Sequence, residues 1–250
     1  MSRGEPDRRD APGRPVTGDR AGDVGADAAE ASYDGGSDFA AGAGSAAGFD
    51  SDAAALWRVL SSRRDHRHFH PTPVPRETIE RLLDVFAVAP SVGLSQPWQV
   101  TVVQDRAVRE AVHAGFRDVR AVEAERFSGE RRHLYDSLRL EGILQAPVGL
   151  VVSHLPPEGP VLGTTSMPAA SEYSVVAAIT LLWLAATAEG LGMGWVSLLD
   201  PQHLSDAVPL PAGARPLAYL CIGHPSRELD EPLLQTVGWA RRRPLQVRWS

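Results

Sequence analysis

The chain has 250 residues, a length typical of one or two domains, and carries a formal net charge of −6. Residues 1–50 hold 10 acidic residues and 5 arginines, so the other 200 residues are almost neutral, with 21 acids and 20 bases. A near-neutral body argues against a general nucleic-acid binder, which needs a basic surface to displace counterions. It also offers no polybasic patch for a membrane surface.

The sequence holds one cysteine, Cys221, and no lysine. A single cysteine excludes an intrachain disulfide and a cysteine-based zinc cluster, and it fits a reducing compartment. The absence of lysine excludes a lysine Schiff base and a P-loop lysine. Any bound anion must therefore be held by arginine, backbone N–H groups or hydroxyls.

Residues 1–50 are predicted to be a disordered tail. They include 10 Gly and 11 Ala and few large apolar side chains, so they cannot bury enough surface to offset their ordering entropy. Residues 51–250 are predicted to form the folded domain. No apolar stretch follows Arg8-Arg9, as an export signal would require, and we therefore expect a cytoplasmic protein.

Hydrophobic spacing and capping residues predict the elements of the body in chain order. Helices are expected at about residues 52–60, 75–89, 105–127, 129–144 and 174–188, with a short one after Pro201. Strands are expected at about residues 98–104, 148–153, 193–199 and 216–222. This irregular alternation favours a layered fold of mixed helices and strands over a doubly wound one.

The segment at 174–188, SVVAAITLLWLAATA, is almost wholly apolar. It is too short for a membrane span, which needs about 20 residues. A helix that is apolar on all sides is instead predicted to be the central helix of a soluble core. Gly190 stands where a left-handed helix cap is expected.

Three constellations could carry chemistry. The first is Arg63-Arg64-Asp65-His66-Arg67, whose three guanidinium groups suit a phosphate; the alternative is a solvated surface run. The second is the loop APSVGLSQPW at 89–98, which could expose hydroxyls and N–H groups to a planar ligand or be an ordinary turn. The third is GLGMGWVS at 190–197, whose spacing is not that of the dinucleotide fingerprint. Its glycines indicate that another chain segment or a ligand passes close by.

In this order the three resemble the flavin-dependent nitroreductase superfamily. The resembling features are Arg-Arg-x-x-Arg-x-Phe, Ala-Pro-Ser-x-x-x-x-Gln-Pro-Trp, a long apolar helix and Gly-Leu-Gly-x-x-Trp, and the resemblance covers about residues 53–245. It implies an α+β, nitroreductase-like fold with a central mixed sheet and helices around it. It also implies an intertwined homodimer that binds FMN at the subunit interface and is reduced by NADH or NADPH.

Two departures from the common pattern are informative. Most nitroreductases carry Ser where this chain has Asp65, and Asn where it has Leu94. Both changes resemble the 5,6-dimethylbenzimidazole synthase branch, as do LEGI at 140–143, Gly194-Trp-Val-Ser197 and Gly238-Trp239. That branch breaks down its own reduced FMN with O2 to form the lower ligand of vitamin B12.

The resemblance implies roles for individual residues. Arg63, Arg64 and Arg67 would hold the FMN phosphate and neighbouring polar atoms, and Asp65 would face the flavin from the same segment, which also contains His66. In this branch the aspartate and the late serine are tied to flavin fragmentation, which makes Asp65 and Ser197 the predicted catalytic residues. A carboxylate beside the flavin can move protons during bond cleavage. The full predicted cofactor-binding set is Arg63, Arg64, Asp65, His66, Arg67, Ser91, Leu140 and Ser197.

Other interpretations of single residues remain open. His66, His68 and His70 alternate, as a metal site on a strand would require, but no carboxylate cluster has matching spacing, and we predict no metal. Cys221 and Trp183 are most simply core residues. Trp239 and the arginines at 241–243 form either a solvated run or an arm that wraps a partner subunit.

The resemblance therefore implies a 5,6-dimethylbenzimidazole synthase that takes reduced FMN as substrate and O2 as co-substrate, with a separate flavin reductase as a further partner. The alternative enzyme is an NAD(P)H-dependent FMN oxidoreductase: a nitroreductase, a flavin reductase or a cob(II)yrinic acid a,c-diamide reductase. A non-catalytic flavin-binding protein is a third hypothesis, which the presence of both Asp65 and Ser197 disfavours. No nucleic-acid or membrane partner is expected.

Overall fold

The computed structural model describes residues 32–33 and 51–249. The chain divides into two units. In the smaller one, β1 (Ser32–Tyr33) pairs antiparallel with β6 (Leu245–Gln246). Apart from Ser32 and Tyr33, the predicted disordered tail of residues 1–50 lies outside the described residues.

The larger unit is built on a four-stranded sheet of order β2-β3-β5-β4. These strands are Trp98–Val103, Val148–His154, Arg215–Gly223 and Gly192–Val196, respectively. All three pairings within the sheet are antiparallel. The parallel component of the predicted mixed sheet is limited to an isolated bridge between Asp65 and Met193. The α+β class is confirmed.

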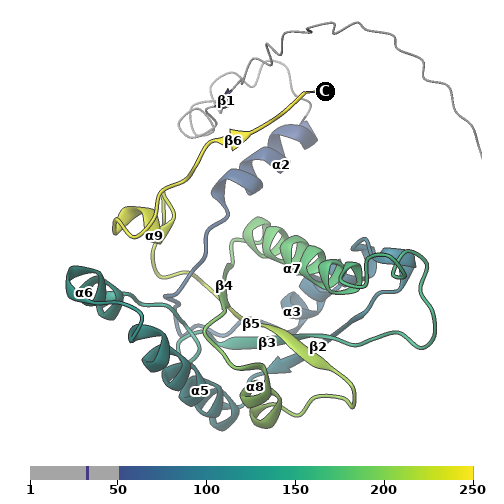
Figure 1. Ribbon diagram of the computed structural model, residues 1–250, viewed down its shortest axis with the longest axis horizontal. Coiled ribbons are helices and arrows are strands. Elements are labelled where there is room, and N and C mark those ends of the chain that lie inside the picture. Colours follow the sequence, from purple (N-terminus) through teal and green to yellow (C-terminus); the bar gives the residue numbers. More distant parts are fainter. Residues whose placement is uncertain (1–31, 34–50, 250) are drawn as a thin grey trace, which may run out of the picture. The chain divides into compact units, whose positions relative to one another are not determined.

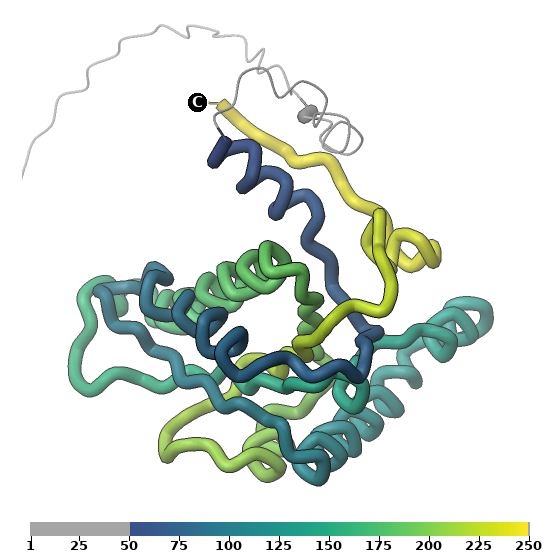
Figure 2. The backbone as a smooth tube through the Cα atoms, turned by 180° about the vertical axis from the view of Figure 1, so that it is seen from behind, coloured from purple at the N-terminus to yellow at the C-terminus, as the bar shows by residue number. Residues whose placement is uncertain are grey.

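Helices lie on both faces of this sheet, as the views from the front (Figure 1) and from behind (Figure 2) show. One face carries α3 (Arg76–Leu83), α4 (Val85–Val88) and α7 (Ala170–Ala188). The other carries α5 (Arg106–Ala124) and α8 (Pro201–Ala207). The larger unit also contains α2 (Ser51–Ser62), the short helix η1 (Val92–Leu94), α6 (Gly129–Ser137) and α9 (Leu233–Thr236).

Strand periodicity separates the two cores. Leu220 and Ile222 of β5 face the α7 side, whereas Tyr219 and Cys221 face the α5 side. All four are at most 1% exposed. The alternation has the period of two that a strand imposes on its side chains, and it gives the sheet a core on each face.

Helix α6 ends seven residues earlier than predicted. Its end is fixed by Arg120 of α5, whose guanidinium donates to the carbonyls of Tyr135, Asp136 and Leu138 at 3.3, 3.0 and 2.9 Å. Leu138 then turns to an extended conformation and is buried. A distant arginine thus satisfies the last carbonyls of the helix, which no local pattern in the sequence signals.

Helix α7 starts four residues before the predicted apolar run. With 19 residues it is, within the described part of the chain, the one helix whose length and composition would allow it to span a membrane. Val175, Ala178, Ile179 and Leu182 are fully buried in the core over the sheet, as the sequence predicts for a central helix. The predicted cap is also confirmed, because Gly190 has a φ of 73°.

Candidate flavin site along the edge of β4

The arginine-rich segment at 63–67 runs beside the outer edge of β4. The N–H of His66 donates to the carbonyl of Met193 at 3.0 Å, next to the parallel bridge between Asp65 and Met193. Farther along, the N–H of Trp195 donates to Asp65 Oδ1 at 3.1 Å, and Arg67 Nη2 donates to the Trp195 carbonyl at 3.1 Å. Side chains thus satisfy backbone groups that an edge strand would leave open.

The glycines of β4 make this close approach possible. A Cβ at Gly194 would overlap the carbonyl oxygen of His66 and lie 2.8 Å from Arg67 Nη1. A Cβ at Gly192 would lie 3.0 Å from the His66 ring. Gly192 and Gly194 of this pattern are therefore explained by a second chain segment, which is one of the two alternatives that the sequence leaves open.

Asp65 and Arg67 form a two-point ion pair. Arg67 Nη1 and Nη2 donate to Asp65 Oδ1 and Oδ2, respectively. The Arg67 side chain is 13% exposed and that of Asp65 is 42% exposed. Burial raises the pKa of Asp65, while the charge and hydrogen bonds of Arg67 and the Trp195 N–H oppose this rise.

His66 points to β4, where its ring contacts Gly192. Burial, together with the positive charges of Arg64, Arg67 and Arg63, lowers the pKa of His66. At neutral pH this imidazole is uncharged and contributes no cationic group to anion binding.

Ser197 directly follows the end of β4 and is exposed. It lies two residues after Trp195, a rise of roughly 6.6 Å along an extended chain, and the Trp195 N–H binds Asp65. Ser197 also lines a pocket of about 310 Å³ between the ends of β4, β5 and α8. The contacts of Asp65 and the position of Ser197 thus both fall at the C-terminal end of β4.

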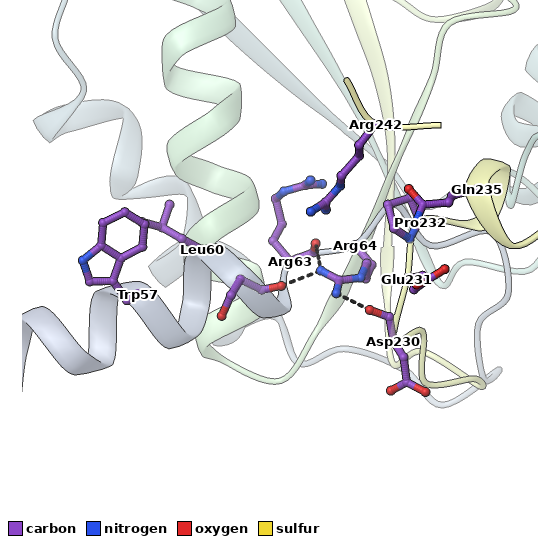
Figure 3. A pocket seen from close by; sticks show the side chains of 10 residues that line it. Trp57, Leu60, Arg63, Arg64, Asp230, Glu231, Pro232, Gln235 and Arg242 are labelled. Carbon is purple, nitrogen blue, oxygen red and sulfur yellow. Dashed lines mark hydrogen bonds between the residues drawn. The ribbon is translucent and has the colours of Figure 1, made fainter. Parts of the chain in front are cut away.

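Arg63 and Arg64 enter a second pocket of about 220 Å³, together with Arg242 (Figure 3). Arg63 and Arg242 extend toward one another across it. Trp57 and Leu60 of α2 form an apolar side, and Asp230 and Glu231 contribute carboxylates; the remaining lining residues are Ser61, Pro232 and Gln235. Three arginines around one pocket give the setting in which a phosphate is commonly held.

Arg64 acts as an anchor within this pocket. Its guanidinium donates to the carbonyls of Ser61, Arg63 and Asp230, which ties the end of α2 to a loop 166 residues away. Burial lowers the pKa of Arg64, and the neighbouring charges of Arg242 and Arg63 lower it further. Of the three pocket arginines, Arg64 is thus held by backbone carbonyls, whereas Arg63 and Arg242 extend toward one another across the pocket.

Trp183 of α7 organises the same segment. Its Nε1 donates to the Arg64 carbonyl at 3.1 Å, and its ring lies 4.8 Å from the Arg63 guanidinium carbon in a cation–π contact. Trp183 packs against the α7-side core, as the sequence predicts, and its indole in addition contacts the Arg63 side chain and the Arg64 carbonyl.

Ser91 and Leu140 lie elsewhere in the chain. The Ser91 hydroxyl accepts from the Gln96 N–H at 3.0 Å, and the neighbouring Val92 N–H donates to Ser174 Oγ at 3.0 Å. Ser174 and Trp183 are nine residues apart on α7, about 13 Å along the helix axis. Within a single chain, Ser91 therefore does not lie beside Arg63 and Arg64. Leu140 packs at the border of the α5-side core, two residues before Gly142, which contacts the Arg67 carbonyl and Phe69.

Among residues 32–33 and 51–249, no group of three or more His, Cys, Asp or Glu side chains is placed to hold a metal.

Trp239 packs against Phe127 and Tyr135 of its own chain, with ring centroids 5.1 and 6.0 Å away. In the single chain Trp239 is thus an anchor for the C-terminal segment.

The comparison with protein families decides the affiliation of the chain. The model of the nitroreductase family matches residues 60–224, which span the segment at 63–67, the sheet and α7. The chain belongs to the nitroreductase family.

Two curated relatives of this family member are similar over most of their length. A 5,6-dimethylbenzimidazole synthase of Rhodospirillum rubrum is 46% identical over 187 residues, covering 74% of this chain and 89% of the relative. A protein of the same name from Rhodobacter capsulatus is 43% identical over 194 residues, with 77% and 94% coverage. These similarities place the chain in the 5,6-dimethylbenzimidazole synthase branch of the nitroreductase family.

Solved structures confirm the nitroreductase fold. An iodotyrosine deiodinase bound to FMN and 3-iodo-L-tyrosine has a TM-score of 0.62 at 23% identity, covering 78% of this chain and 98% of that one. A nitroreductase with bound FMN from Bacteroides fragilis has a TM-score of 0.51 at 20% identity, with 68% and 88% coverage.

Proposed function

We propose that this protein is a 5,6-dimethylbenzimidazole synthase, which fragments reduced FMN with O2 to form the lower ligand of vitamin B12. The observation that carries the proposal is the position of Asp65. The Asp65 carboxylate accepts from the N–H of Trp195, two residues before Ser197, and Asp65 directly follows Arg64, which lines the arginine pocket. An enzyme that passes electrons from a flavin to an outside acceptor has no use for an anion there, because the negative charge opposes flavin reduction.

The residues fit a phosphorylated flavin. Arg63 and Arg242 face one another across a pocket, and two like charges at such a site are stabilised when an anion lies between them. Without lysine in the chain, these guanidinium groups supply the charge for a phosphate. Arg63 and Arg242 hold the FMN phosphate, and Arg64 and Trp183 keep this end of the site in place.

Reduced FMN, when bound, supplies the ring atoms that become the benzimidazole and the electrons that react with O2. Asp65 moves protons at its carboxylate, as a general acid and base adjacent to the ring. Ser197, exposed at the end of β4, would donate or accept a hydrogen bond to the bound flavin. Burial raises the pKa of Asp65 toward the range in which a carboxylate can both take and give a proton.

A homodimer supplies the rest of the site. Helix α7 is apolar on all sides, yet Tyr173, Val176 and Thr180 on its outer face are exposed in the single chain. Such a face is covered by a second copy of the chain. The dimer also accounts for the distance between Ser91 and the arginines, since a second copy can bring its own Ser91 loop to the flavin.

Reduction of the flavin draws on NADH or NADPH, directly or through a separate flavin reductase, and the protein acts in the cytoplasm. The deciding assay incubates it in air with excess FMN, NADH and a flavin reductase and measures 5,6-dimethylbenzimidazole by mass spectrometry. Formation of the product supports the proposal. Turnover of quinones or nitroaromatics without any benzimidazole would identify an electron-transferring oxidoreductase instead.

Charge on the outer face of α7 should separate the subunits. In Val176→Glu, a carboxylate would be buried at the interface without a partner, which costs several kcal/mol. We expect this variant to elute as a monomer in size-exclusion chromatography with light scattering, and to bind FMN weakly. Val122→Glu alters a valine on α5 that is more exposed than Val176 and serves as the control. A dimeric Val176→Glu would place the interface elsewhere.

Trp183 should affect FMN affinity through Arg63. Trp183→Leu removes the hydrogen bond to the Arg64 carbonyl and the cation–π contact, each worth about 1 kcal/mol. We expect FMN to bind roughly 10- to 30-fold more weakly. Trp183→Phe keeps a ring beneath Arg63 and should lose less. Equal affinity in all three proteins, measured by flavin fluorescence, would make Trp183 a core residue only.

A further inference from the structure

The Arg67 guanidinium binds a carboxylate and two backbone carbonyls of its own chain. It donates to both oxygens of Asp65, to the Trp195 carbonyl at 3.1 Å and to the His66 carbonyl at 3.4 Å. With 13% of its side chain exposed, it has little surface left to offer a phosphate. Arg67 therefore differs from Arg63 and Arg242, whose guanidinium groups enter the pocket.

The place that Arg67 occupies depends on Gly194. A Cβ at this position would lie 2.8 Å from Arg67 Nη1 and would overlap the His66 carbonyl oxygen. The backbone of residue 66 cannot retreat easily, because the His66 N–H is bonded to Met193 at 3.0 Å. A glycine in the strand is thus required for the arginine to lie flat against it and reach Asp65.

The Asp65 carboxylate faces few other charges. Arg63 is a more distant cation that also lowers the pKa of Asp65. On the β5 side lies Cys221, whose thiol is kept protonated because burial raises its pKa to about 12. Arg67 is the cation that contacts Asp65 directly, and a two-point guanidinium–carboxylate pair fixes direction as well as charge.

We propose that Arg67 is a positioning residue, which fixes the direction of the Asp65 carboxylate and stabilises its charged form, and that Gly194 makes room for it. The consequence for catalysis rests on the proposed function, in which Asp65 moves protons beside the flavin. The pairing itself belongs to the chain without ligand and can be tested there. Arg67 would then affect the rate and pH dependence of the reaction more than the binding of FMN.

The first test measures the titration of Asp65 in the flavin-free protein by carbon-13 NMR of its carboxyl group. Three proteins are compared: wild type, Arg67→Lys and Arg67→Met. In Arg67→Met, loss of the cation should move the midpoint upward by about one pH unit or more. In Arg67→Lys, where charge remains but the two-point geometry is lost, the midpoint should move less. An unchanged midpoint in Arg67→Met would overturn the proposal.

The second test separates positioning from phosphate binding. Arg67→Lys should lower the rate of benzimidazole formation at least 10-fold and move its pH profile upward, while FMN affinity changes less than threefold. Arg76→Lys alters an exposed arginine paired with Glu80 and is the matched control. A large loss of FMN affinity with unchanged riboflavin affinity would make Arg67 a phosphate ligand and contradict the proposal.

Gly194→Ala provides an independent variant. It leaves Arg67 and Asp65 in the sequence but removes the space for their pairing, so its Asp65 midpoint should move in the direction seen for Arg67→Met. A normal midpoint in folded Gly194→Ala, checked by circular dichroism, would overturn the role of Gly194. If wild type yields no benzimidazole, the proposed function fails, whereas the NMR titration still decides on the pairing.

Discussion

Asp65→Asn is expected to abolish benzimidazole formation and to leave FMN binding nearly unchanged. The amide has the shape of the carboxylate and can still accept from the Trp195 N–H, which lies 3.1 Å from Asp65 Oδ1. It cannot take up or release a proton in the working pH range, and proton transfer by a placed side chain contributes about 100- to 10,000-fold to a rate. We therefore expect a loss of at least about 100-fold in product, measured by mass spectrometry with excess reduced FMN in air.

Asp84→Asn is the matched control for this experiment. Asp84 is an exposed carboxylate between α3 and α4, and its side chain caps neither helix. The control should make product at the wild-type rate. An Asp65→Asn protein that kept this rate would contradict the catalytic role of Asp65, and one that lost FMN binding as well would make Asp65 a cofactor ligand.

The positions of most helices and strands are predictable from the sequence because local patterns determine them. Asp105 caps α5 by accepting from the N–H groups of Ala107 and Val108 at 2.7 and 3.2 Å. Asp200 caps α8 in the same way, with Pro201 in its first turn. Capping aspartates and first-turn prolines act within three residues, so the sequence contains all that is needed.

The end of α6 and the role of Arg120 could not be predicted in this way. Arg120 lies 15 to 18 residues before the carbonyls that it binds, and nothing in the spacing connects them. The same holds for Arg242, which lines the pocket of Arg63 from almost 180 residues away. Because Arg242 stands in a charged C-terminal run, its sequence context indicates a solvated residue, and only the fold shows that it lines the pocket.

Part of the candidate site can be predicted from the sequence. Residues 63–67 could be singled out because three arginines fall within five positions of a near-neutral body. The separate roles of these three arginines cannot be predicted from the sequence, because they depend on the residues that the fold places beside each one. Arg64 meets backbone carbonyls, Arg67 meets Asp65 and a strand edge, and Arg63 meets the Trp183 ring and a pocket. Trp183 itself gave no sign of this contact, because it stands in a wholly apolar run.

Removing Arg63 and Arg242 should weaken FMN binding more than any other change away from the flavin ring. A charge-assisted hydrogen bond to phosphate contributes about 1.5–3 kcal/mol, which corresponds to roughly 10- to 150-fold in affinity. We expect a loss of this size for Arg63→Ala and again for Arg242→Ala. Because both guanidinium groups face one pocket, the double variant should differ from the sum of the single ones.

Riboflavin distinguishes phosphate binding from a general loss of structure, since it has the same ring without the phosphate. Its affinity should be the same in wild type, Arg63→Ala and Arg242→Ala, while the salt dependence of FMN binding should become weaker in the variants. Arg106→Ala, which removes an exposed arginine paired with Glu110, should match wild type for both ligands. Equal losses for FMN and riboflavin would show that Arg63 acts on the flavin ring or on the fold, and the phosphate would then have to be bound outside the pocket between Arg63 and Arg242.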